Sequence, residues 1–245
     1  MSVAVSAMSM LFIPRALKVF PVICLSRVHF AQRSSAPPSA TVRESSARRR
    51  SSIECRTSPQ MNFPESVKYL MSLGNEVSTM KLGLENIRSL LRLLGDPQRA
   101  YVGVQIAGTN GKGSVCAFLG SIIKESKLKV GVMTSPHLID IRERIVIDGH
   151  PITEDLFAEI ATTVRQAAEQ LAEGEGGRVP TFFEQITAIG AIAFKEHSVE
   201  IAVLETGLGG RLDAVTAFDA GFVGISRIAL DHQEYLGSTL FEIAG

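Results

Sequence analysis

The chain has 245 residues, of which 45% are hydrophobic and 20% charged, so it can bury a sizeable core as one large or two small domains. No stretch of about 18 apolar residues is free of charge, so the sequence predicts no transmembrane helix and no membrane partner. The net charge is zero, yet residues 1–60 carry nine basic and two acidic side chains, and the acidic remainder argues against broad nucleic-acid binding.

Residues 1–60 have the composition of a targeting segment. They are rich in Arg and Ser and contain no acid before Glu44, which is typical of a mitochondrial presequence. A secretory signal is one alternative, because residues 20–25 are apolar, and a disordered or non-native extension is another. Met61 would serve as an internal start that gives a cytoplasmic form. We therefore expect a disordered presequence over 1–60 and a folded part over 61–245.

Two amphipathic helices are predicted over 63–73 and 84–94, because apolar residues recur there at steps of three and four. Gly95-Asp96-Pro97 ends the second helix. A short turn, Lys81-Leu82-Gly83-Leu84, lies between them. The apolar run 101–107 then predicts a buried strand.

The loop after this strand, 108–114, has the sequence Gly-Thr-Asn-Gly-Lys-Gly-Ser, and an apolar helical pattern follows it over 115–123. Strand, glycine loop and helix are the context of a phosphate-binding loop, whose backbone N–H groups and helix N-terminus attract anions. Lys112 adds a full charge and Ser114 a hydroxyl for Mg²⁺. The common spacing of such loops is not met, and a plain glycine turn is the alternative.

Beyond this loop the sequence predicts alternating strands and helices. The strands are expected over 129–134, 144–148, 199–204 and 221–228, and the helices over 153–171 and 181–194, with a flexible glycine loop at 174–177. This α/β pattern predicts a mostly parallel sheet with helices on both faces. Ligands bind such sheets at the carboxyl ends of the strands, where the polar motifs of this chain lie.

Glu205 ends a predicted buried strand, where a carboxylate is costly unless it is paired or bound to a metal. Mg²⁺ prefers such oxygen ligands, and a salt bridge to Arg211 or Lys112 is the alternative. His232 follows the next strand at the same edge and is either a loop residue or a ligand. Ser135, alone, would be unremarkable.

Four segments, in this order along the chain, resemble the folylpolyglutamate synthase and dihydrofolate synthase family of the wider Mur ligase group. They are 108–114, 134–138 (Thr-Ser-Pro-His-Leu), 205–214 (Glu-Thr-Gly-Leu-Gly-Gly-Arg-Leu-Asp-Ala) and 230–237 (Leu-Asp-His-Gln-Glu-Tyr-Leu-Gly). The resemblance covers about 61–245. Mur ligases share the first segment, whereas the second and third point to the folate branch.

The resemblance implies a monomeric, ATP- and Mg²⁺-dependent ligase that adds L-glutamate to folate or dihydropteroate through an acyl phosphate. It assigns ATP binding to the glycine loop, with Lys112 as the catalytic residue: Gly108, Thr109, Asn110, Gly111, Lys112, Gly113 and Ser114. It implies the metal ligands Ser135, Glu205 and His232, with Ser114 near the nucleotide magnesium. It places the pterin on Lys81, Leu82, Gly83, Leu84, Thr181, Phe182, Phe183, Glu184, Leu212, Asp213 and Ala214. Phe182 and Phe183 would stack on the flat heterocycle, unless one of them packs in the core.

The chain also departs from the family pattern. The family continues past the position of Gly245 with Glu-Lys, whose lysine is typically carbamylated, and with a second domain. We therefore expect an incomplete ATP-binding domain that is inactive alone. Gln105 replaces a histidine of many relatives, which we expect to matter little. The alternatives are an inactive nucleotide-binding product of such a gene and a P-loop kinase or GTPase, for which a base-specificity motif is missing.

Overall fold

The computed structural model describes residues 59–74, 83–174 and 177–244, which form a sheet of six strands in the order β4-β3-β2-β5-β1-β6. The strands are β1 (Val102–Ala107), β2 (Val130–Met133), β3 (Ile145–Ile147), β4 (His150–Pro151), β5 (Ile201–Glu205) and β6 (Phe222–Ile225). Strands β2, β5, β1 and β6 are parallel, whereas β3 and β4 continue the sheet antiparallel. The predicted mostly parallel α/β sheet is therefore confirmed.

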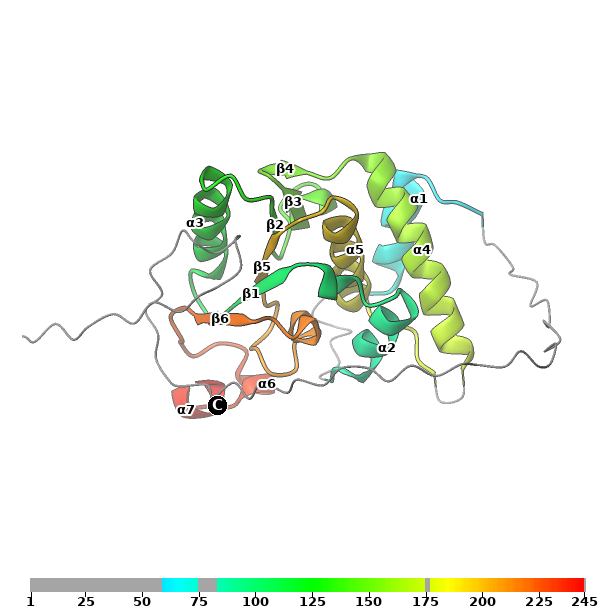
Figure 1. The fold of residues 1–245 in the computed structure, drawn as a ribbon. Coiled ribbons are helices and arrows are strands. Elements are labelled where there is room, and N and C mark those ends of the chain that lie inside the picture. The colour runs from blue at the N-terminus through cyan, green and yellow to red at the C-terminus, as the bar shows by residue number, and fades with distance from the viewer. Residues whose placement is uncertain (1–58, 75–82, 175–176, 245) are drawn as a thin grey trace, which may run out of the picture. The chain divides into compact units, whose positions relative to one another are not determined.

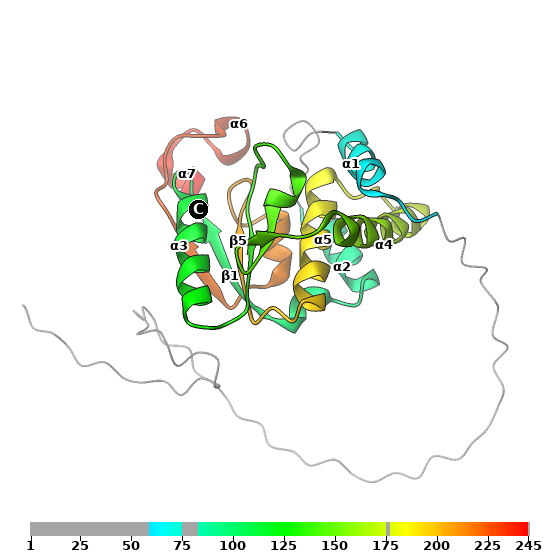
Figure 2. The ribbon, with the colours of Figure 1, turned by 90° about the horizontal axis from the view of Figure 1, so that it is seen from above.

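Helices cover both faces of this sheet (Figures 1 and 2). The α-helices are α1 (Phe63–Ser72), α2 (Glu85–Leu93), α3 (Lys112–Glu125), α4 (Glu154–Glu173), α5 (Phe182–Glu196), α6 (Gln233–Leu236) and α7 (Leu240–Ala244), and the 3-10 turns are η2 (Pro97–Ala100), η3 (Ile141–Arg144) and η4 (Ala214–Phe218). Helix α3 packs with the sheet in a small core, and α5 with α1, α2 and α4 builds a larger core. Within the described ranges, no helix has both the length and the apolar surface that a bilayer crossing requires.

Three helices begin where their capping residues predict. The Asn62 side chain accepts from the Glu65 N–H at the start of α1, and the Thr153 hydroxyl accepts from the Leu156 N–H at the start of α4. Thr181 and Glu184 form a reciprocal capping box at the start of α5. These local hydrogen bonds satisfy backbone donors that a helix leaves open, so sequence alone locates these boundaries.

Helix α5 lies unusually close to the sheet. A Cβ added to Gly131 on β2 would stand 2.6 Å from the Phe194 ring, and one added to Gly190 would overlap the Met133 side chain. At its other end, Phe183 lies against Gly207, just beyond the last residue of β5. Helix α5 therefore runs antiparallel to β2 and β5 and begins at the carboxyl edge of the sheet.

The structure corrects two expected boundaries and adds two short helices. Helix α3 begins at Lys112, not at Val115, so the lysine of the glycine loop belongs to the first helical turn. Strand β6 ends at Ile225; the Ser226 N–H still donates to the Ala107 carbonyl, and the next residues then bind the glycine loop. Helices α6 and α7 were not predicted, since each is only about one turn long.

Several expectations fall outside the part of the chain that the structure describes. They concern residues 1–58, Lys81 and Leu82 of the short turn, and residues 175–176 of the flexible loop. For these segments the predictions stay predictions.

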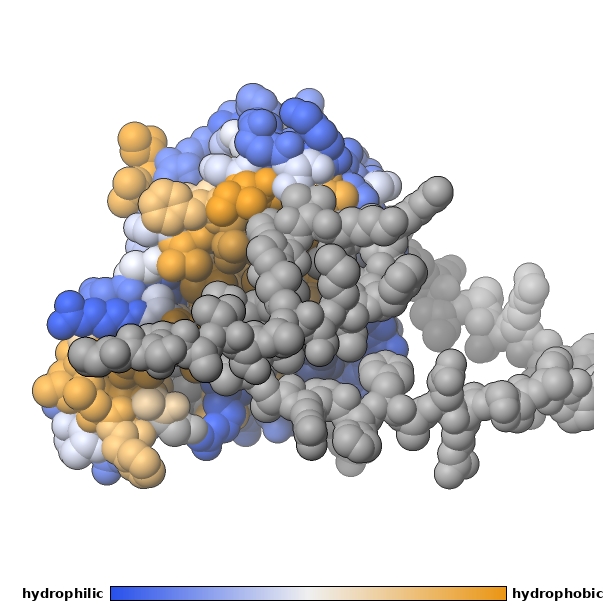
Figure 3. All heavy atoms as spheres, turned by 60° about the vertical axis from the view of Figure 1, so that its left-hand side comes forward, coloured by the Kyte–Doolittle hydropathy of each residue, from blue (hydrophilic) through white to orange (hydrophobic). Residues whose placement is uncertain are grey.

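Apolar side chains gather on the side of the molecule that carries α3, β6 and α7 (Figure 3). The exposed large apolar residues of these elements are Phe118, Ile122, Phe222, Val223, Ile225, Leu240 and Phe241. Strand β6 is the last strand of the sheet among the described residues, so its outer backbone edge has no partner strand there. This side is the open edge of the described fold.

Candidate functional site

The glycine loop joins the end of β1 to the start of α3, and two glycines set its path. Gly108 has φ +125°, and a Cβ at this position would overlap the Ser226 hydroxyl. Gly111 has φ +84° and is the N-cap of α3, with open space where a Cβ would stand. Both φ values lie in the region that only glycine adopts at little cost. Gly108 is therefore required by conformation and space, and Gly111 by conformation.

The start of α3 supplies the backbone donors of this loop. The first helical hydrogen bond runs from the Val115 N–H to the Gly111 carbonyl, so the amides of Lys112, Gly113 and Ser114 have no acceptor within the helix. Together with the positive end of the helix dipole, these amides can bind an anionic phosphate. This geometry fits the predicted phosphate site.

Thr109 and Asn110 of the glycine loop bind the segment 226–229 through their backbone. Both of their backbone N–H groups donate to the Arg227 carbonyl, at 2.9 and 3.1 Å. The Thr109 hydroxyl donates to the Ala229 carbonyl and accepts from the Ala229 N–H. These two residues hold the loop against 226–229, so their own backbone N–H groups are not available to a phosphate, whereas the amides at the start of α3 are.

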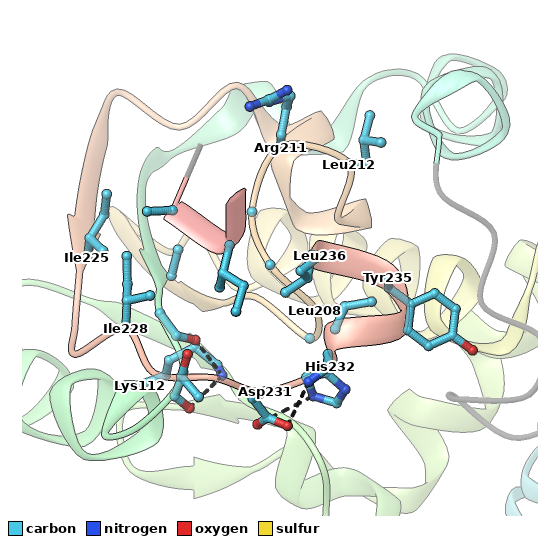
Figure 4. A pocket seen from close by; sticks show the side chains of 18 of the residues that line it. Lys112, Leu208, Arg211, Leu212, Ile225, Ile228, Asp231, His232, Tyr235 and Leu236 are labelled. Carbon is cyan, nitrogen blue, oxygen red and sulfur yellow. Dashed lines mark hydrogen bonds and ion pairs between the residues drawn. The ribbon is translucent and has the colours of Figure 1, made fainter. Parts of the chain in front are cut away.

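Lys112 folds back over the loop from the first turn of α3. Its Nζ donates to the carbonyl of Gly108 at 2.9 Å and to that of Thr109 at 3.4 Å. The ammonium group is thus held beside the donors of the loop, where it can add a full positive charge to a bound phosphate. Figure 4 shows it at one side of a cavity.

Glu205 lies next to this loop, as the last residue of β5. Its carboxylate is 7% exposed and accepts from the Ser135 N–H at 3.2 Å. A Cβ on Gly113 would stand 3.6 Å from Glu205 Oε2, so the carboxylate approaches the first turn of α3. Burial, and then the charge of Glu205, raise the pKa of the buried Cys116 thiol on α3 to about 12. The structure therefore brings Ser135, Glu205 and the glycine loop together, as the sequence predicts.

His232 lies in a different part of the site from Glu205 and Ser135. It is exposed, has φ +49°, and its Nε2 is 3.8 Å from Asp231 Oδ2. Both residues line the cavity that Lys112 also reaches (Figure 4). Across the described segments, no three His, Cys, Asp or Glu side chains are grouped for a metal ion. A metal here would need hydroxyl or phosphate oxygens beside Glu205, which are the oxygen donors that suit Mg²⁺.

The cavity has a volume of about 480 Å³ and opens at the carboxyl edge of the sheet. Its wall is mostly apolar, with few polar groups, which is usual for a small-molecule site. Its lining residues include Gln105, Lys112, Leu208, Arg211, Thr216 and Leu236. Arg211 stands at its rim in Figure 4, on the segment that follows β5.

The segment after β5 is shaped by Asp213. Its carboxylate accepts backbone N–H bonds from Gly207, Leu208 and Val215, each at 2.9 Å. Asp213 is the N-cap of η4, and it is buried. These contacts give it a structural role in the loop 206–213, and its predicted contact with the pterin stays a prediction.

Replacing Asp213 with asparagine should therefore destabilise the protein. An amide has one acceptor oxygen and would turn its NH₂ toward a backbone donor, so we expect a loss of about 1–3 kcal/mol in the free energy of unfolding. Urea denaturation measures this loss. Asp219→Asn is the control, because Asp219 is exposed and its 3.5 Å ion pair with Arg88 is also at the surface. Equal stability of the two variants would contradict the structural role.

The other residues of the predicted pterin site are divided between core and cavity. Phe182 is 3% exposed and packs in the larger core, with the Arg144 guanidinium 5.2 Å above its ring. This position rules out stacking of Phe182 on a ligand, and the alternative of core packing holds for it. Phe183 is half-buried beside Gly207.

The remaining members of that set have the following places. Thr181 and Glu184 cap α5, Leu84 and Ala214 are buried, Leu212 is exposed and lines the cavity, and Gly83 has φ +154°. The hydrogen bond from Gln105 to Thr216 was not predicted from the sequence, although a polar residue inside a buried strand is a signal for such a partner. The bonds of the glycine loop to the Arg227 and Ala229 carbonyls were not predicted either, because contacts with a distant segment leave no pattern in the sequence.

Known proteins that are similar to this chain are named as dihydrofolate or folylpolyglutamate synthases. The chain is 42% identical over 166 residues to a probable dihydrofolate synthetase of Schizosaccharomyces pombe, a match that covers 67% of this chain and 39% of that protein. It is 38% identical over 167 residues to a dihydrofolate synthase/folylpolyglutamate synthase of Bacillus subtilis, covering 68% and 39%. No protein-family profile matches it.

Solved structures give the same picture. The apo form of L. casei FPGS superposes with a TM-score of 0.70 and 35% identity, covering 75% of this chain and 44% of that one. E. coli FolC in complex with DHPP and ADP superposes with a TM-score of 0.67 and 34% identity, covering 76% and 43%. The chain thus spans about two fifths of the length of these relatives.

Proposed function

Over about three quarters of its length this chain is homologous to the folylpolyglutamate synthase and dihydrofolate synthase family, and we propose that it carries the ATP-binding part of such a ligase. The observation that carries the proposal is the position of Glu205, which accepts from the Ser135 N–H and lies beside Gly113 of the glycine loop, at the carboxyl edge of β1, β2 and β5. Phosphate donors, a lysine and a buried carboxylate meet there. The relatives solved with ADP or AMPPCP support the same assignment.

The proposed reaction joins L-glutamate to a folate or dihydropteroate carboxylate at the expense of ATP. The terminal phosphoryl group passes from ATP to the carboxylate oxygen and leaves ADP; the glutamate amine then attacks the acyl carbon, forms the amide and releases phosphate. The amides of Lys112, Gly113 and Ser114 and the Lys112 ammonium would hold the phosphates and offset their charge during this transfer. Glu205, with the hydroxyls of Ser135 and Ser114, would hold Mg²⁺, which offsets phosphate charge when bound. His232 is proposed as a further ligand.

Titration of the 245-residue chain with ATP and MgCl₂ by isothermal calorimetry tests the nucleotide site. We expect saturable binding with one site per chain, because the loop, the helix end and Lys112 converge on one phosphate position. Omission of MgCl₂ should weaken the binding of ATP. Ligase turnover with dihydropteroate or folate and labelled glutamate then distinguishes an active enzyme from a nucleotide-binding product. Absence of any ATP binding would contradict the proposal.

We also propose that the protein works as a monomer and that its first 60 residues direct it to mitochondria. The support for the second point is the Arg- and Ser-rich composition before Met61. Mass spectrometry of the N-terminus from a mitochondrial fraction should find a start between about residues 30 and 60. An intact Met1 or Ser2 in that fraction would refute the presequence, and a start at Met61 in the cytosol would support the internal start.

A further inference from the structure

Two polar residues in the wall of the cavity have no part in the proposed catalysis. Gln105, on β1, is 6% exposed, and Thr216, on η4, is half-buried. The Gln105 Nε2 donates to the Thr216 hydroxyl at 2.8 Å, although 111 residues separate them in the chain. Both line the cavity. Buried polar side-chain atoms usually have a hydrogen-bond partner, so a buried amide at a cavity wall is expected to form hydrogen bonds.

The hydroxyl of Thr216 fixes how this amide is turned. It donates to the Gly210 carbonyl at 2.6 Å and has one proton, so toward Gln105 it can only accept. The NH₂ of Gln105 must therefore face Thr216, and its Oε1 faces away. Among the residues that the structure describes, the one hydrogen bond of the Gln105 side chain is made by its Nε2, and none is made by this oxygen. It is an acceptor for a ligand in the cavity.

The same chain of bonds holds one wall of the cavity. The Gly210 carbonyl also accepts from the Asp213 N–H at 3.1 Å, and Arg211 follows Gly210 at the rim (Figure 4). The opposite wall, the glycine loop, is held separately by the bonds of Thr109 and Asn110 to 226–229. Loss of the Gln105–Thr216 bond should therefore disturb the Gly210 wall and leave the phosphate loop in place.

We propose that Gln105 is a positioning and specificity-determining residue for the folate-type substrate of the proposed ligase. Through Thr216 it holds the Gly210–Arg211 wall, and its Oε1 accepts from a neutral N–H donor of a flat heteroaromatic ring. Apolar walls from Leu208, Ile228 and Leu236 suit such a ring. An amide oxygen repels phosphate and carboxylate groups, so the phosphates of the nucleotide are not its ligands, and the AMPPCP measurement below tests whether the adenine ring is. This inference rests on the proposed function.

Paired variants of Thr216 test the proposal in the 245-residue chain. Thr216→Val keeps the shape of the side chain and removes both hydrogen bonds, and Thr216→Ser keeps the hydroxyl. We expect Thr216→Val to weaken folic acid binding at least about tenfold by calorimetry and to leave AMPPCP binding within about twofold. Thr216→Ser should stay within about threefold of wild type for both ligands. Gln105→Leu should behave like Thr216→Val.

Hydrogen exchange measured by mass spectrometry gives a second readout that needs no ligand. Residues 207–212 should exchange faster in Thr216→Val than in wild type or Thr216→Ser, whereas 109–110 should not change. Unchanged exchange, wild-type folic acid affinity in Thr216→Val, or an equal loss of both ligands would overturn the proposal. If the wild-type chain binds AMPPCP but not folic acid, the assignment of a folate-type substrate is wrong and the proposed nucleotide site still stands. If the wild-type chain binds neither ligand, the proposed function is wrong. Hydrogen exchange of residues 207–212 then still tests whether the Gln105–Thr216 bond holds this segment.

Discussion

Lys112→Ala is expected to lower the affinity of this chain for ATP by about a hundredfold and to abolish ATP turnover in the complete enzyme. The Lys112 Nζ lies 2.9 Å from the Gly108 carbonyl and above the amides at the start of α3, so its charge acts where the phosphates are proposed to bind. A charge-assisted hydrogen bond to phosphate contributes about 1.5–3 kcal/mol, which corresponds to roughly 10- to 100-fold in affinity. Calorimetric titration with ATP and MgCl₂ measures the loss.

The matched control for this variant is Lys124→Ala. Lys124 lies in the last turn of the same helix and is exposed, so its removal changes the net charge equally and leaves the loop intact. We expect ATP affinity within about twofold of wild type. Thermal unfolding of both variants shows whether Lys112→Ala also loosens the loop through its bonds to Gly108 and Thr109. Retained ATP binding in Lys112→Ala would refute the nucleotide role of the lysine.

Gly108→Ala is expected to cost about 2–6 kcal/mol of unfolding free energy and to remove ATP binding. The new Cβ would overlap the Ser226 hydroxyl and lie 3.1 Å from two Ser226 backbone atoms, and the φ of +125° is strained for any L side chain. Overpacking of this kind costs about 1–3 kcal/mol, and such a backbone conformation costs about 1–3 kcal/mol more. Relief requires movement of 226–229, which carries the bonds of Thr109 and Asn110. Chemical denaturation and calorimetry measure the two effects.

Three further variants separate the clash from the backbone strain. Gly111→Ala has the strained φ of +84° but open space, so we expect a loss of only about 1 kcal/mol in stability. Gly221→Ala meets no atom within 4 Å and has no positive φ, so its stability should match wild type. Gly108→Ala with Ser226→Gly removes the side-chain overlap and should recover part of the loss. Wild-type stability in Gly108→Ala would mean that the loop does not pack on Ser226 as described.

Periodicity and capping residues were sufficient for the large elements of the fold. Helices α4 and α5 begin at Thr153 and Thr181, because an N-cap hydroxyl satisfies backbone donors within three residues and so leaves a local signal. The buried strands β1, β2 and β5 appear in the sequence as short apolar runs, because both faces of these strands are covered by other elements. The predicted start of α3 was too late. Residues 112–114 (Lys-Gly-Ser) are helical but carry no apolar side chain, so the apolar pattern begins only after them.

Fold and loop chemistry could be predicted, while the partners of individual side chains could not. The mostly parallel sheet, the strand–glycine loop–helix unit and the shared edge of Ser135 and Glu205 could be predicted from the sequence, because apolar runs and loop composition are local properties. The structure was needed to find that Phe182 packs in the core, that Asp213 shapes the loop 206–213, and that Gln105 binds Thr216 across 111 residues. Such pairings depend on which residues the packed layers bring together, and hydrogen bonds between distant segments leave no periodic pattern in a single sequence.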